Sequence, residues 1–143
     1  MPVTHPHDFE HAIHTSNIWL KAVSQALGTE DRHFAHRVLR AWLHTFRDRL
    51  TVDVAAHFAA QLPELLRGVY YDGWDPSAVP IRYDRDGYVN RFVQEAKVSA
   101  EEVPRIAAAV TGVVREHFSP GALDSALEQL PHEIRSMFLQ PAD

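Results

Sequence analysis

Apolar residues recur at steps of three and four along most of the chain, which is the period of an α-helix that is buried on one side. The first such segment runs from Asp8 to Leu27, and Gly28 follows at the position where a left-handed residue commonly ends a helix. We expect one face of this segment to lie in the core. That face comprises Phe9, Ile13, Ser16, Leu20, Val23 and Leu27.

Three further helices are predicted before residue 72. Thr29 can cap the second helix, Thr51 can cap a short third one, and Pro63 fits the first position of a fourth. The apolar stripe of the second helix comprises Ala35, Val38, Leu39, Trp42, Phe46 and Leu50. Residues 72–86 then break the pattern with Asp-Gly and Asp-Pro turn signals. We interpret them as an ordered connector with Trp74 folded back onto the helices.

The chain repeats itself after this connector. The string QLPELLRGVY at 61–70 returns as QLPHEIRSMF at 129–138, so that Gln61 corresponds to Gln129. In the same register and without a gap, RVLRAWLHTFRDRLT at 37–51 lies over RIAAAVTGVVREHFS at 105–119. We call this alignment the repeat register. Apolar, charged and capping positions all correspond. A match of this length indicates an internal duplication, and internal repeats decide the architecture.

The duplication predicts an all-α fold in which residues 1–143 form a single domain. Repeat one covers about 9–71, the connector 72–86, and repeat two about 87–139. Each repeat contains two longer and two short helices. A lone unit of this size buries too little surface to be stable, so we expect the two repeats to pack together pseudo-symmetrically.

Capping signals place the helices of repeat two. Ser99 and Glu102 form a capping-box pattern, and the long helix that follows is expected to begin at Val103. In the repeat register Thr51 corresponds to Ser119. Ser119 is therefore expected to cap the next short helix.

Composition narrows the class of protein. A hydrophobic fraction of 45% and a charged fraction of 23% are ordinary for a folded globular domain. The formal net charge of −5 opposes general affinity for nucleic acid, which depends on Lys and Arg side chains. The sequence has no apolar run long enough to cross a membrane, no signal-peptide pattern before Lys21 and no cysteine. Together these features favour a cytoplasmic location.

Three histidines lie near the start of the first helix, namely His7, His11 and His14. Imidazoles three or four residues apart on a helix can chelate zinc or nickel, so these residues are the candidate metal ligands. They lie opposite the face that carries Phe9 and Ile13, where no buried partner would fix the rings. A solvated face that binds Zn or Ni only adventitiously is therefore favoured, and no cofactor is expected.

The string YYDGWDP supplies the candidate ligand or partner surface. Tyr71 and Trp74 join large apolar bodies to polar tips, a combination common in pockets and interfaces. Arg40 and Arg47 complete the candidate set, on a face of the second helix that is expected to be solvated together with His44. The alternative is structural, because Trp74 has no counterpart in repeat two and can simply fill the junction between the repeats.

The strings TSNIWLKAVSQALGTEDRHFAHRVLRAWLHTFRDRL and AAQLPELLRGVYYDGWDP resemble the bacterial family known as domain of unknown function 2267. The resemblance covers the chain from about Thr15. It implies a duplicated helical module with a QLP segment in each copy and an aromatic connector after the first. Repeat two is shorter around Lys97–Ser99 than this pattern implies. The family has no established reaction, so no catalytic residue is carried over.

These patterns favour a non-catalytic role. The sequence has no Gly-rich phosphate loop, no His-Glu-x-x-His motif and no nucleophile elbow. We therefore expect a helical module that binds another protein or forms homo-oligomers. The alternative is a protein that binds a small molecule or a divalent metal, through the junction between the repeats or through the N-terminal histidines.

Overall fold

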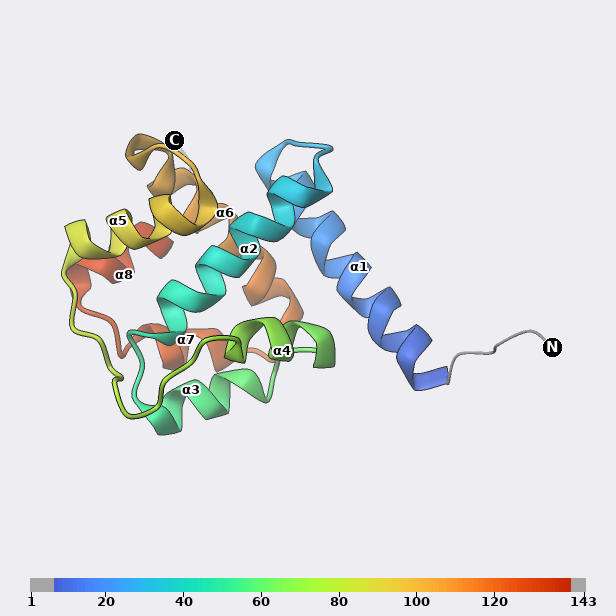
Figure 1. Cartoon of the computed structure of the whole chain (residues 1–143), viewed down its shortest axis with the longest axis horizontal. Coiled ribbons are helices and arrows are strands. Elements are labelled where there is room, and N and C mark those ends of the chain that lie inside the picture. The colour runs from blue at the N-terminus through green and yellow to red at the C-terminus, as the bar shows by residue number, and fades with distance from the viewer. Residues whose placement is uncertain (1–6, 140–143) are drawn as a thin grey trace.

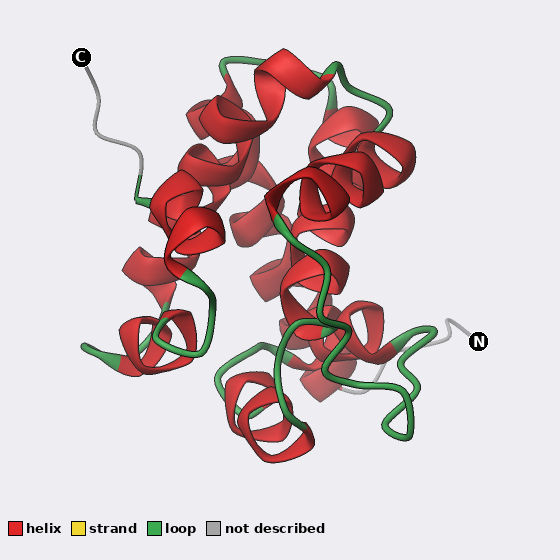
Figure 2. Ribbon diagram, turned by 90° about the vertical axis from the view of Figure 1, so that its left-hand side faces the viewer, coloured by secondary structure: helices red, strands yellow, loops and turns green. Residues whose placement is uncertain are grey.

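The structure is a computed structural model that describes residues 7–139, and this part of the chain consists of helices and loops without strands (Figure 1). Figure 2 shows the same helices from the side. The predicted all-α class is confirmed. None of the described helices is both long and apolar enough to cross a membrane. The elements are α1 (His7–Leu27), α2 (Arg32–Arg47), α3 (Val52–Ala59), α4 (Glu64–Tyr71), α5 (Arg85–Ala96), the 3-10 turn η1 (Ala100–Glu102), α6 (Val103–His117), α7 (Ala122–Leu127) and α8 (His132–Phe138).

Helix α2 lies at the centre and packs against α1, α4, α5 and α6 (Figure 1). Its predicted apolar stripe is buried along the whole length, and the rings of Trp42 and Phe46 stack with centroids 4.9 Å apart. The capping residue differs from the prediction. Asp31, not Thr29, accepts hydrogen bonds from the backbone N–H groups of the first turn, because the Asp31 carboxylate directly precedes that turn. Thr51 caps α3 as predicted.

Both repeats contribute to one core. Phe138 at the end of α8 meets Trp42 and Phe46 of α2, with ring centroids 5.8 Å apart in each case. Helices α1 to α4 precede the connector and α5 to α8 follow it, in the order that the duplication predicts. The copies are unequal in length, since α1 has 21 residues and its counterpart α5 has 12. The pseudo-symmetric relation between the repeats remains a prediction.

Helix α1 buries the predicted face only in its C-terminal half, where Val23 is buried and Leu20 and Leu27 pack against the core. Trp19 and Val23 are buried, whereas Phe9 and Ile13 remain 58% and 52% exposed. The C-terminal half of α1 packs on α2 and α6, and Trp19 meets His117, the last residue of α6, with ring centroids 4.7 Å apart. The residues before Trp19 project beyond the bundle, with α4 along one side (Figure 1). The prediction that Phe9 and Ile13 lie in the core is therefore wrong, because their partner helix ends too early.

Caps explain where the helices of repeat two begin. The capping box of Ser99 and Glu102 is present, and α6 begins at Val103, as predicted. Ser119 does not cap α7. The N-cap is Gly121, whose φ of 82° is accessible to glycine at little cost, and α7 starts one residue later. The Ser119 backbone N–H instead donates to the Gln61 side chain over 3.2 Å.

The connector is ordered, as predicted, and ends slightly earlier than expected. Asp84 caps α5 by accepting from the Gly87 backbone N–H, so the connector spans 72–84. Its second half is held on α2, because the Ile81 backbone N–H donates to the carbonyl oxygen of Asp48 over 2.7 Å. Trp74 folds back onto the helices and is half-buried.

Buried tyrosines predict a loss of stability at high pH. Burial raises the pKa of Tyr70, Tyr83 and Tyr88 above the ordinary value of about 10, since a buried phenolate loses its hydration. Because the folded-state pKa is raised, the free energy of unfolding is fully present below about pH 10 and falls as the pH rises further. We expect helix loss by far-UV circular dichroism to accompany tyrosinate absorbance. Conversion of all 4 tyrosines in a chain that keeps its helices would contradict this.

Candidate functional site

Arg47 is buried, contrary to its predicted place on a solvated face, and is only 3% exposed. Its Nε donates to the Asp48 carboxylate over 2.8 Å, and its Nη1 donates to the carbonyl oxygens of Tyr70 and Asp72 over 2.7 and 2.8 Å. These carbonyls lie at the C-terminal end of α4, where the last carbonyl groups of a helix lack partners within it. Arg47 therefore fastens α4 to α2.

The Asp48 carboxylate extends this cluster into repeat two. Its second oxygen accepts a hydrogen bond from Arg91 of α5 over 2.7 Å. Asp48 itself is buried, so its charge is compensated by two guanidinium groups that come from different repeats. We call Arg47, Asp48 and Arg91 the buried arginine cluster after its two buried members, since the Arg91 side chain is 39% exposed.

His44 is also buried, and neither of its ring nitrogens is free. Nδ1 contacts the Glu95 carboxylate, and Nε2 lies 2.7 Å from the carbonyl oxygen of Val69. A hydrogen bond to that carbonyl oxygen uses the N–H of Nε2, because a carbonyl oxygen only accepts. A histidine beside a carboxylate acts as a general base only when its other nitrogen can reach a substrate. This pair joins α2, α4 and α5 and is not arranged for catalysis.

Arg40, Tyr71 and Trp74 are brought to the same part of the surface. Arg40 is half-exposed and pairs with Asp72 and with Glu95. The rings of Tyr71 and Trp74 have centroids 5.2 Å apart, directly beside Asp72 in the chain. Three of the four predicted ligand or partner residues therefore meet where α2, α4 and the connector join. Binding at this surface stays a prediction.

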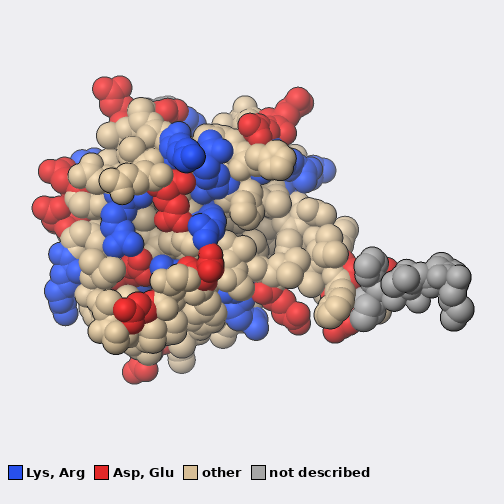
Figure 3. Space-filling model, viewed as in Figure 1, with Lys and Arg blue, Asp and Glu red and all other residues tan. Residues whose placement is uncertain are grey.

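Arg37 and Arg49 explain why the many arginines in and just after α2 do not make a positively charged surface. Arg37 donates to the carbonyl oxygen of Ala96, at the C-terminal end of α5, over 2.7 Å. Arg49, just after α2, donates to the carbonyl oxygen of Tyr83 in the connector over 3.2 Å. On the face drawn in Figure 3, positive and negative side chains alternate and do not separate into a patch of one sign. The guanidinium groups are used largely to bind carbonyls within the fold.

The histidines His7, His11 and His14 lie on the exposed surface of the projecting half of α1. Within residues 7–139, no group of three or more His, Asp or Glu side chains is arranged to hold a metal ion. His11 instead lines a hollow of about 240 Å³ between α1 and α4, together with Arg67. Metal binding by these residues stays a prediction.

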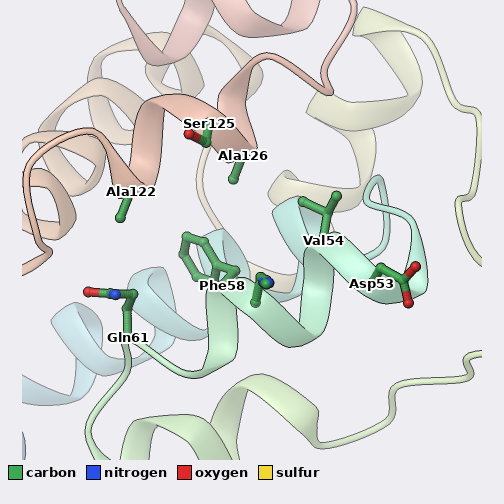
Figure 4. A pocket seen from close by; sticks show the side chains of 8 residues that line it. Asp53, Val54, Phe58, Gln61, Ala122, Ser125 and Ala126 are labelled. Carbon is green, nitrogen blue, oxygen red and sulfur yellow. The ribbon is translucent and has the colours of Figure 1, made fainter.

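A larger cleft of about 540 Å³ lies between α3 and α7 (Figure 4). Its lining consists of Asp53, Val54, His57, Phe58, Gln61, Ala122, Ser125 and Ala126. The side chains of Val54 and Phe58 point towards α7, and Asp53 and Gln61 mark opposite ends of the cleft (Figure 4). The sequence patterns did not indicate this cleft, because the aromatic residues of the connector pointed to the junction between the repeats at Trp74.

Removing the buried arginine should cost far more stability than removing its repeat counterpart. Arg47→Met leaves one oxygen of the buried Asp48 carboxylate and two carbonyl groups without their donor, and we expect a loss of about 3–5 kcal/mol in the free energy of unfolding. Arg115→Met is the matched control, because Arg115 corresponds to Arg47 in the repeat register. Arg115 pairs with Asp124 on the surface, with side chains 44% and 59% exposed, so its removal should cost less than about 1 kcal/mol. Urea unfolding followed by circular dichroism measures both, and equal losses would contradict the assignment.

Comparison with known protein families gives a match over most of the chain. No curated protein matches the chain. A family model, described as an uncharacterized conserved protein (DUF2267), matches residues 16–137, which cover most of both repeats and the whole connector. The family suggested by the QLP segments and the aromatic connector is thereby confirmed, and the chain belongs to the DUF2267 family.

Proposed function

We propose that the protein is a non-catalytic helical module that self-associates through the projecting half of α1. The observation that carries this proposal is the exposure of Phe9 and Ile13, two large apolar side chains one helical turn apart. We call them the α1 ridge. Scattered single apolar residues are normal on a protein surface, but an aligned pair on a protruding helix is typical of a contact surface.

A second copy of the chain is the partner that fits this ridge best. In a twofold-symmetric pair the same surface patch serves both subunits, so that Phe9 of one copy can pack against Ile13 of the other. Antiparallel packing of the two α1 helices would cover both ridges at once, and α4 leaves this side of α1 open. Because the ridge is small, the association should be weak and should depend on protein concentration.

The polar groups of the fold support a binding role over catalysis. The ring of His44 is engaged at both nitrogens, and the donors of Arg47 are directed at backbone carbonyls and Asp48. A buried polar cluster with its hydrogen bonds satisfied rigidifies a structure and offers no reactive group. The exposed apolar surface is then what the fold presents to a partner.

Sedimentation equilibrium over a range of concentrations tests self-association. We expect wild type to shift from monomer towards dimer as concentration rises, and Phe9→Ser/Ile13→Ser to remain monomeric with unchanged circular dichroism. Ile18→Ser is the matched control. Ile18 is 45% exposed and lies about 180° around the helix from Phe9, so its variant should dimerise like wild type. A monomeric wild type, or a dimer that persists without the ridge, would refute the proposal.

A further inference from the structure

The lining of the α3/α7 cleft follows the internal duplication. In the repeat register, three pairs of equivalent positions face into it: Val54 with Ala122, His57 with Ser125, and Phe58 with Ala126. The same helix face from each repeat therefore forms each wall. In every pair the residue of repeat two is the smaller one. Since protein interiors are otherwise close-packed, this loss of bulk on one wall accounts for the open volume.

Polar contacts beside the cleft hold α7 in place. Arg115 of α6 pairs with Asp124 of α7 over 2.8 Å. Asp124 directly precedes Ser125, which lines the cleft. The Gln61 carboxamide, at the end of α3, accepts from the Ser119 backbone N–H before α7. Movement of α7 onto α3 would break the Arg115–Asp124 pair, while the Gln61 contact fixes one end of the cleft. The volume of about 540 Å³ falls within the range of about 300–1,000 Å³ that is usual for small-molecule sites.

The chemistry of the lining favours an apolar molecule with a positive charge. Phe58 and Ala126 are buried and give the cleft an apolar floor. Asp53 contributes a carboxylate at one end, and within the described residues it has no Lys, Arg or His partner within 4.0 Å. No Lys or Arg lines the cleft to attract an anion. The net charge of −5 acts in the same direction.

We propose that this cleft binds a small molecule with an apolar body and one ammonium group. The body packs on Phe58 and Ala126 between the two helices, and the ammonium lies beside the Asp53 carboxylate. Such a site needs neither the α1 ridge nor a second copy. Ligand binding in the cleft is therefore independent of self-association.

Three probes with the same apolar body test the head group. Octylamine, octanol and octanoate are titrated separately into the full chain, with binding followed by NMR chemical shifts of the α3 and α7 backbone amides. We expect saturable binding in the order octylamine, octanol, octanoate. Absence of saturable octylamine binding would overturn the proposal. Octanoate binding as tightly as octylamine would overturn the assignment of charge.

Variants locate the binding in the cleft. Asp53→Asn, at an exposed position that leaves the fold intact, should weaken octylamine roughly three- to ten-fold and leave octanol unchanged. Ala126→Leu should abolish binding of all three probes by filling the space, and Ser125→Leu does the same from an exposed position if the buried change impairs folding. Ala26→Leu, in the separate groove between α1 and α6, is the control and should bind as wild type. Unchanged octylamine affinity in the Asp53 and cleft-filling variants would place binding elsewhere.

Discussion

A charged side chain buried at the end of the central helix constrains everything around it. The Arg47 guanidinium loses its hydration there, which costs several kcal/mol unless every donor is matched. Its matches come from Asp48, from the end of α4 and from the first residue of the connector, and Asp48 in turn binds Arg91 of α5. The positions of α2, α4, α5 and the connector therefore depend on one another. The repeat counterpart of Arg47 is Arg115, which pairs on the surface, so only the first repeat carries this constraint.

This arrangement separates the part of the molecule that holds the fold together from the part that can bind. The polar residues most suggestive of chemistry, His44 and Glu95, bond to each other and to a backbone carbonyl. Two of the surfaces left open carry apolar side chains. One is the α1 ridge, which is exposed because α1 extends beyond the end of α6. The other is the α3/α7 cleft, which is open because repeat two has smaller side chains at the lining positions. Both arise where the two copies of the duplication differ.

Sequence reasoning succeeded where local rules decide the structure and failed where the surroundings decide it. The stripe of α2, the start of α6 at Val103 and the ordered connector follow from periodicity and capping, which depend on neighbouring residues alone. Periodicity identified the apolar face of α1 but could not tell that the partner helix ends at His117, and so Ile13 was placed in the core. The sequence pattern places Arg47 on the polar side of α2 and hence in solvent. Neighbouring helices cover that side too, so Arg47 is buried. The aligned repeats do contain a sign of the cleft, because Ala126 stands where repeat one has Phe58. Only a comparison of side-chain sizes at equivalent positions would have revealed it.

The central claim is that the buried arginine cluster and the common core make the two repeats one cooperative unit. Differential scanning calorimetry of the wild-type chain tests this most directly. We expect a single transition whose calorimetric and van't Hoff enthalpies agree, as for two-state unfolding of one domain. Two separable transitions, or a calorimetric enthalpy well above the van't Hoff value, would show that the repeats unfold independently and would contradict it.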